Sequence, residues 1–277
     1  MAQGIDPAKV TETLSHIRSV IVVLSGKGGV GKSTVAVNVA AGMAARGRRV
    51  GLLDADLHGP SVPGLLGVKG QNAHGDDSAL EPVLACNGRV KVMSVGFLLR
   101  GQDDSVIWRG PLKHAVISQF LGNTVWGDLD LLVVDSPPGT GDEPLSVVQI
   151  AKPAGAVVVT TPQEVATSDV RRSIDFCRRL HLPVIGVIEN MSGFVCPHCG
   201  RATPIFGFGG GRQMAESMEV PFLGALPIDP AMVALGDAGR TCFDDGVECG
   251  LRTAYEGVLD AIVLATGGDS GAGRAAR

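Results

Sequence analysis

The sequence predicts an α/β fold, in which a single doubly wound domain has a mostly parallel sheet flanked by helices. Short continuous apolar runs alternate with stretches of helical spacing, which is typical of a parallel sheet covered on both faces. The 39 glycines sit at the ends of these runs, where tight strand-to-helix turns need them. Of the 277 residues, 45% are hydrophobic, so the chain can bury a full core.

The predicted elements follow one another without a visible linker or internal repeat. An apolar β-branched run at 19–25 precedes a glycine loop, and Val35, Val39 and Met43 then share one face of a helix at 32–46. We expect an N-terminal segment at 1–18, one domain at 19–266 and a disordered tail at 267–277, with irregular insertions at 57–89 and 191–211. Further strands are predicted at 48–54, 90–95, 129–135, 156–160, 184–189 and 221–226, and further helices at 111–121, 142–150, 165–180, 212–218 and 251–265.

Composition narrows the class of protein. The net charge of -4 and the pI near 5.9 argue against a nucleic-acid partner, which requires a basic surface. The first residues contain no apolar signal core, and no apolar run approaches the roughly 18 residues of a membrane helix. Six cysteines in so long a chain do not form a disulfide framework. We therefore expect a cytoplasmic protein with reduced thiols and no membrane partner.

The stretch SGKGGVGKST, residues 25–34, contains the phosphate-loop pattern G-x-x-x-x-G-K-S. Its glycines allow backbone N–H groups to converge on an anion, and the following helix N-terminus adds partial positive charge. Lys32 is expected to contact the β- and γ-phosphates, and Ser33 to offer its hydroxyl to Mg²⁺. The predicted nucleotide-binding residues are Gly26, Lys27, Gly28, Gly29, Val30, Gly31, Lys32, Ser33 and Thr34.

A second lysine, Lys27, lies in the same loop. Placing it beside Lys32 is unfavourable because like charges repel, unless a bound polyphosphate offsets the repulsion. Alternatively, Lys27 points away and meets a phosphate that is bound in another subunit.

Acidic residues end two of the predicted strands. Asp135 follows the apolar run LDLLVV, which is the position of an acid that holds Mg²⁺ through water. Asp54 and Asp56 follow another strand in LLDADLHGPS. One of these two carboxylates can support the metal and the other can orient the attacking water.

The stretch CPHCG holds two thiols, Cys196 and Cys199, in a tight turn that suits a metal. A tetrathiolate site needs two more cysteines. Within the chain the candidates are Cys242 with Cys249, or Cys86 with Cys177, although the spacing places Cys177 on the core face of its helix. A symmetric dimer would instead supply the same pair twice, which makes a Cys₄ set for a [4Fe–4S] cluster or for zinc. A bare redox dithiol remains the simplest alternative.

The phosphate loop resembles the deviant Walker A loop, with its extra lysine, of the MinD/ParA/nitrogenase-iron-protein class of P-loop ATPases, also termed SIMIBI-type. Together with DLLVVDSPPGTGDEPLSVVQ, TTPQEVATSDVRRSIDFCR and GVIENMSGFVCPHCG, it is similar to the Mrp/ApbC/NUBP iron–sulfur cluster carriers. This resemblance runs from about residue 17 to about residue 229. Ser136 and Phe208 depart from the family pattern.

The resemblance implies a slow Mg²⁺-dependent ATPase that carries a [4Fe–4S] cluster in a homodimer and delivers it to apo iron–sulfur proteins. It implies a signature role for Lys27, which would reach across the dimer, and a water-positioning role for Asp56. The implied residues are Lys27, Lys32 and Asp56 for catalysis, Ser33, Asp54 and Asp135 for Mg²⁺, Asn190 for the adenine edge, and Cys196 and Cys199 for the cluster.

Two other functions remain open. A MinD/ParA-type positioning ATPase with a structural zinc knuckle would need an amphipathic membrane helix or a basic DNA-binding surface. The tail at 267–277 and the net charge of -4 offer neither. An ATP-driven electron donor like the nitrogenase iron protein would carry widely separated cysteines instead of a C-x-x-C pair.

Overall fold

A computed structural model of the chain describes residues 6–76, 78–98, 110–196 and 198–267. Its main sheet has the strand order β10-β9-β8-β1-β7-β2-β6-β5, with β11 also paired to β9. Neighbouring strands are parallel except at β10–β9 and β5–β6, so the predicted mostly parallel sheet is confirmed. The strands are β1 (Val20–Ser25), β2 (Val50–Asp54), β5 (Val83–Ala85), β6 (Val90–Ser94), β7 (Leu131–Asp135), β8 (Gly155–Thr160), β9 (Val184–Val195), β10 (Ala202–Thr203) and β11 (Phe222–Ile228), and a separate ribbon pairs β3 (His74–Asp76) with β4 (Ala79–Glu81).

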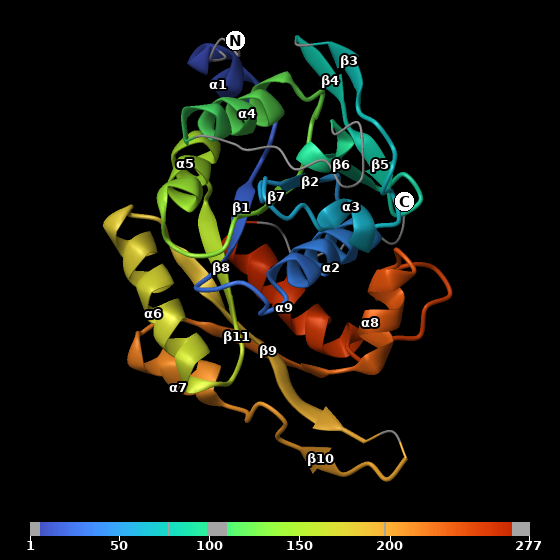
Figure 1. Cartoon of the computed structure of the whole chain (residues 1–277), viewed down its shortest axis with the longest axis vertical. Helices are drawn as coiled ribbons and strands as arrows, with labels where there is room; N and C mark the ends of the chain where they lie inside the picture. Colours follow the sequence, from blue (N-terminus) through green and yellow to red (C-terminus); the bar gives the residue numbers. More distant parts are fainter. Residues whose placement is uncertain (1–5, 77, 99–109, 197, 268–277) are drawn as a thin grey trace.

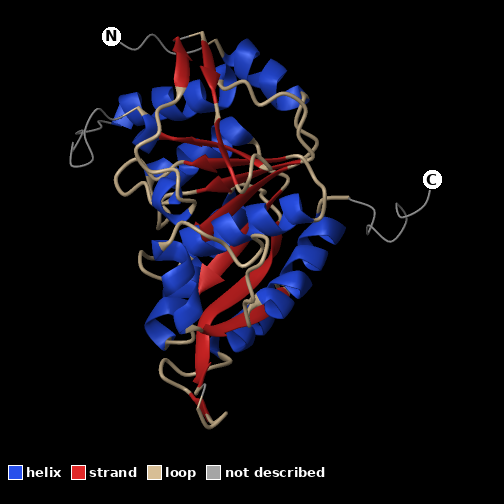
Figure 2. Ribbon diagram, turned by 90° about the vertical axis from the view of Figure 1, so that its right-hand side faces the viewer, coloured by secondary structure: helices blue, strands red, loops and turns tan. Residues whose placement is uncertain are grey.

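Helices cover both faces of this sheet, as Figure 2 shows. One face carries α2 and α9, which contact each other, and the other carries α5, α6 and α7 (Figure 1). The helices are α1 (Pro7–Ser15), α2 (Lys32–Ala45), α3 (Val62–Leu65), α4 (Gly110–Asn123), α5 (Asp142–Ala151), α6 (Glu164–Arg179), α7 (Gly210–Ser217), α8 (Pro230–Asp237) and α9 (Arg252–Ala265), with a short 3-10 turn at Val95–Phe97.

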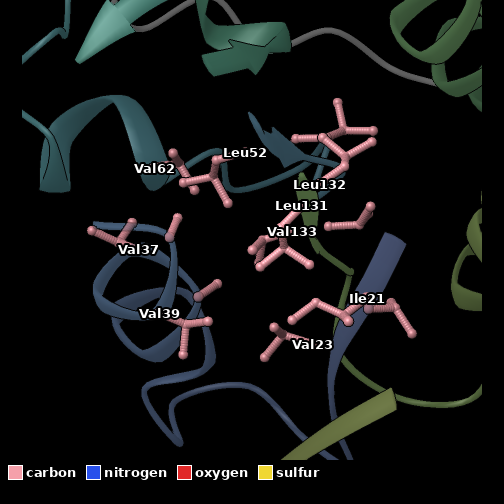
Figure 3. Packing of buried hydrophobic residues seen from close by; sticks show 14 of the residues in the cluster. Ile21, Val23, Val37, Val39, Leu52, Val62, Leu131, Leu132 and Val133 are labelled. Carbon is pink, nitrogen blue, oxygen red and sulfur yellow. The ribbon is translucent and has the colours of Figure 1, made fainter. Parts of the chain in front are cut away.

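The core lies between α2 and the central strands (Figure 3). Ile21 and Val23 of β1, Leu132 of β7 and Val39 of α2 are completely buried. Burying such a side chain contributes about 1.5–3 kcal/mol to the free energy of unfolding. The core therefore fixes the strand ends from which the phosphate loop and its acids extend.

Several elements were not predicted. Helices α1 and α8 each begin with an acid followed by proline: Asp6 accepts from the N–H of Ala8 at 2.9 Å, and Asp229 accepts from that of Ala231 at 2.9 Å. The predicted irregular segments are also more ordered than expected, because 57–89 contains α3, β3, β4 and β5, and 191–211 contains β10 and the end of β9. The predicted tail lies outside the described residues apart from Gly267.

The cysteines differ from the expectation of six reduced thiols. Cys242 and Cys249 form a disulfide with their Cα atoms 5.3 Å apart, because the seven-residue step between them folds back on itself. The fully buried Cys242 also donates its N–H to Asn38 Oδ1 of α2 at 3.0 Å. In the part of the chain that the structure describes, no helix is both long and apolar enough to cross a membrane.

Candidate functional site: a phosphate loop and a thiol hairpin

The phosphate loop extends from the carboxyl end of β1, which lies between β7 and β8. Gly29 and Gly31 both have φ of +81°, a conformation that side chains disfavour, and Gly31 leads directly into α2. The turn after β7 is fastened to the same strand, since Ser136 donates its N–H to Val23 O at 3.2 Å and Gly139 donates to Ser25 O at 2.8 Å. The loop and this turn therefore form one rigid unit around the N-terminus of α2.

Lys32 and Asp135 form a buried ion pair beneath the loop. Their Nζ and Oδ1 atoms are 2.5 Å apart, and the two residues are 6% and 0% exposed. The β2–β7 register places the fully buried Asp54 directly beside Asp135. Asp54 accepts from Ser94 Oγ at 3.1 Å, but Asp135 Oδ2 is buried without a hydrogen-bond partner. Two adjacent carboxylates and one unpartnered oxygen form a donor set that fits Mg²⁺.

Burial is the main influence on both acids. It raises the pKa of Asp54 well above its ordinary value, the neighbouring Asp135 raises it further, and Lys32 opposes both. Burial also raises the pKa of Asp135, while Lys32 and a hydrogen bond with Ser33 lower it. A bound dication would stabilise the charged form of both carboxylates.

The structure places the other predicted nucleotide residues at the rim of this site. Asp56 is half-buried, and its Oδ1 accepts from the N–H groups of His58 and Gly59 at 3.3 and 3.2 Å. Lys27 is half-buried, and no ion pair to it is found among the described residues. Asn190 reaches the loop from β9 and donates its Nδ2 to Val30 O at 2.9 Å. The roles assigned to these three side chains stay predictions.

The two thiols of CPHCG lie at the tip of the thiol hairpin, residues 191–208, which projects away from the body of the domain (Figures 1 and 2). The Cys196 N–H donates to Arg201 O at 3.1 Å, and that of Gly200 donates to Cys196 O at 2.9 Å. Cys196 is half-buried and Cys199 is exposed. Hydrogen bonding to the backbone of His198 and of Cys199, and to the Cys199 thiol, lowers the pKa of Cys196. These sulfurs are accessible and disposed to bind a soft metal.

The remaining cysteines do not complete a metal site with this pair. The proposed partners Cys242 and Cys249 are bonded to each other, so that alternative is wrong. Cys86 follows β5, at the edge of the sheet opposite to β9, and Cys177 is buried in the core as predicted. Burial raises the pKa of both thiols to about 12. Across the described ranges, no three His, Cys, Asp or Glu side chains are grouped so as to hold a metal ion.

Apolar side chains surround the thiols on the hairpin. Val195 is 54% exposed, Ile205 53% and Phe208 63%. Phe208, the departure from the family pattern, lies against the hairpin backbone near Gly193. We refer to these three residues as the hairpin patch. A cluster of exposed apolar residues of this kind marks an interaction surface more often than an ordinary solvent-facing one.

One functional candidate escaped the sequence predictions. Glu189 ends the apolar run VIGVI, as Asp54 and Asp135 end theirs, and it is 1% exposed. The same signal, an acid at the end of a buried strand, could have identified it. It lies on β9, between Asn190 at the phosphate loop and the thiol hairpin.

Comparisons with known proteins agree with this geometry. A family described as ParA, NUBPL iron-transfer P-loop NTPase, matches residues 16–263. The chain is 50% identical over 254 residues to a cytosolic Fe-S cluster assembly factor NUBP2 homolog of Monosiga brevicollis, covering 91% of this chain and 88% of that protein. It is 51% identical over 231 residues to NUBP2 of Rattus norvegicus, covering 82% and 85% of the two chains.

Solved structures show the same fold. A nucleotide-binding protein of Archaeoglobus fulgidus in complex with ADP superimposes with a TM-score of 0.79 at 40% identity, over 90% of this chain and 97% of that one. The cell division ATPase MinD of Pyrococcus furiosus superimposes with a TM-score of 0.65 at 22% identity, over 89% and 98%, which shows a shared fold alone. The chain therefore belongs to the NUBPL iron-transfer P-loop NTPases, within the MinD/ParA class.

Proposed function

We propose that this protein is an ATP-binding and ATP-hydrolysing carrier that assembles a [4Fe–4S] cluster between two copies of the chain and transfers it to apo iron–sulfur proteins. Cys196 and Cys199 of each copy would hold the cluster. The observation that carries the proposal is the incomplete set of ligands, with two accessible thiols at the hairpin tip and the other four cysteines buried, distant or bonded to each other.

A two-fold dimer would complete this set without any further residue. Contacts across a two-fold axis repeat the same patch on both copies, so the two thiols of one copy can meet those of the other. The hairpin patch gives such a contact an apolar surface beside the thiols, and four thiolates suit a [4Fe–4S] cluster. A cluster at an interface is also exposed to release, which a carrier needs. The names of the relatives, cytosolic Fe-S cluster assembly factors, support a cytoplasmic role in assembly.

The nucleotide site would provide the driving reaction. Lys32 would leave Asp135 for the phosphates, and Ser33, Asp54 and Asp135 would hold Mg²⁺. The ion would supply charge stabilisation to the transferring phosphoryl group. Asp56 would orient the attacking water, and Lys27 would approach the phosphates of the partner copy. Asn190 would contact the adenine edge.

Metal analysis tests the proposal directly. The protein is reconstituted anaerobically with iron and sulfide, and iron, sulfide, zinc and particle mass are then measured. We expect about four irons and four sulfides per dimer, lost in Cys196→Ala and in Cys199→Ala but retained in the matched control Cys86→Ala. Zinc held by a monomer would overturn the carrier function and favour a positioning ATPase with a structural zinc knuckle.

Transfer is measured separately. The loaded protein is mixed with an apo protein that needs a [4Fe–4S] cluster, and recovery of that protein's activity is followed. Recovery from the loaded wild type, and none from the Cys199→Ala protein treated in the same way, is the expected result. Equal recovery from both would mean that free iron and sulfide, rather than the bound cluster, supply the recipient.

A further inference from the structure

Glu189 is a buried carboxylate held entirely by neutral donors. Its Oε1 accepts from Ser192 Oγ at 2.5 Å and from the Gly209 N–H at 2.8 Å, and its Oε2 accepts from the Gly211 N–H at 2.5 Å. No ion pair to it is found among the described residues. Burying a carboxylate is costly unless its oxygens are hydrogen-bonded, so this arrangement of donors fixes the side chain in place.

These three donors lie on both sides of the thiol hairpin. Ser192 lies where the chain leaves the sheet toward Cys196, and Gly209 and Gly211 lie where it returns to begin α7. Glu189 itself is the last residue of β9 that pairs with β8, opposite Thr160. The carboxylate therefore closes the neck of the hairpin, which carries Cys196 and Cys199 at its far end.

The returning side of the neck is packed tightly. A Cβ at Gly210 would lie 2.2 Å from Pro162 O, and a Cβ at Gly211 would lie 2.9 Å from Thr160 Cγ2 and 3.0 Å from Glu189 Oε2. With so little free space, this side of the neck cannot shift without moving the carboxylate that binds it.

The next residue, Asn190, contacts the phosphate loop. Successive side chains of a strand point to opposite faces, so Glu189 faces the neck while Asn190 faces Val30, to which it donates at 2.9 Å. Met191 then takes a left-handed φ of +57° as the chain turns into the hairpin, and its Cε lies 3.8 Å from the position of a Cβ on Gly31. A change in the loop at Val30 or Gly31 is thus one peptide away from the neck.

We propose that Glu189 is the positioning residue through which nucleotide binding at the phosphate loop sets the geometry of Cys196 and Cys199. The inference rests on the proposed function and specifies how the thiol site is regulated. Movement of Val30 displaces Asn190, and the neck held by Glu189 carries that displacement to both stems of the hairpin. Coupling of this kind is reciprocal, so an occupied thiol site also alters nucleotide affinity.

The test compares the alkylation rates of Cys196 and Cys199 by iodoacetamide, read site by site by mass spectrometry, with and without saturating Mg·ADP. In the wild type we expect the nucleotide to change the rate by about fivefold or more, the lower range of measured couplings. In Glu189→Gln the ratio should fall to within about twofold of unity while ADP still binds. The matched control Glu216→Gln, an exposed acid on α7, should keep the wild-type ratio.

Ser192→Ala removes one of the three hydrogen bonds and should give an intermediate ratio. It decides the question if Glu189→Gln does not fold. A purely structural role for Glu189 would lower the melting temperature without changing the ratio, and a wild-type ratio in a folded neck variant would overturn the inference. So would an unresponsive wild type that binds ADP. The carrier function itself stands or falls separately, on the iron content of the Cys196→Ala and Cys199→Ala proteins.

Discussion

The phosphate loop and the thiol hairpin both extend from the carboxyl edge of one parallel sheet, yet they are held in different ways. The loop is enclosed: Lys32, Asp54 and Asp135 are buried, and the turn after β7 is bonded to β1. The hairpin projects from the domain, with an apolar patch exposed around two thiols. The difference teaches that one chain can preorganise its nucleotide site alone, whereas its thiol site is built to be finished by another molecule.

The largest effect on this comparison is expected from tightening the loop. A Cβ at Gly31 would lie 2.2 Å from Asn190 Nδ2, at a φ of +81°. Gly31→Ala should therefore lower the free energy of unfolding by about 2–4 kcal/mol through strain and overpacking. Urea unfolding of the nucleotide-free protein measures this change.

Two neighbouring glycines serve as matched controls. Gly29→Ala meets no atom within 4 Å but has the same φ of +81°, so it should cost only about 1 kcal/mol. Gly28→Ala has neither a clash nor a positive φ and should be neutral or slightly stabilising. Equal losses in all three variants would mean that the loop is not packed against Asn190.

The middle effect concerns the buried acids and depends on pH. Folding raises the pKa of Asp54 above its ordinary value of 3.8, so the folded state holds the proton more tightly than the unfolded state. This carboxyl therefore favours folding below pH 3.8 and opposes it increasingly as the pH rises through the raised pKa. Asp54→Asn removes the opposition and should gain about 1–2 kcal/mol over the wild type between acidic and neutral pH.

Urea unfolding at a series of pH values, without metal or nucleotide, measures this gain. Asp56→Asn is the control, since Asp56 is only half-buried and its gain should be smaller. A difference between Asp54→Asn and wild type that stays constant or shrinks as the pH rises would contradict the prediction.

The smallest effect on stability is expected at the hairpin. Val195→Asp changes a side chain that is 54% exposed, so the free energy of unfolding of the monomer should move by no more than about 0.5 kcal/mol. Particle mass after reconstitution should nevertheless shift from dimer to monomer, because the charge enters the hairpin patch. A control substitution at Val125, which is 52% exposed on another part of the surface, should leave the dimer intact. A large loss of monomer stability would show that the hairpin is part of the core.

The sequence predicted the enclosed region well, because burial leaves a strong pattern. Strands such as β1 and β7 are buried on both faces and read as continuous apolar runs, and the acids that end them mark the edge of the sheet. The same reasoning stopped early at Glu189, because the serine and glycine that follow it do not look like a strand. Partners across the sheet extend β9 to Val195, and no local pattern encodes them.

Other misses have local explanations. The pairs Asp6-Pro7 and Asp229-Pro230 are both helix-start signals, with an N-cap acid followed by proline at the first helical position, and each begins a helix that was not predicted. The Cys242–Cys249 disulfide could not be predicted in the same way, because spacing alone does not show that a loop returns on itself. The roles of Lys27, Asp56 and Asn190 rest on a resemblance that only a bound nucleotide can test.

The ion pair between Lys32 and Asp135 has a consequence for how the site is filled. Without ligands, the lysine that should hold phosphate and the acid that should hold metal neutralise each other. A nucleotide arriving alone would leave a buried carboxylate uncompensated, and a metal arriving alone would displace a buried ammonium. Phosphate and metal together exchange both partners at once. We therefore expect the two ligands to enter as a single complex, which makes the empty site resistant to either one alone.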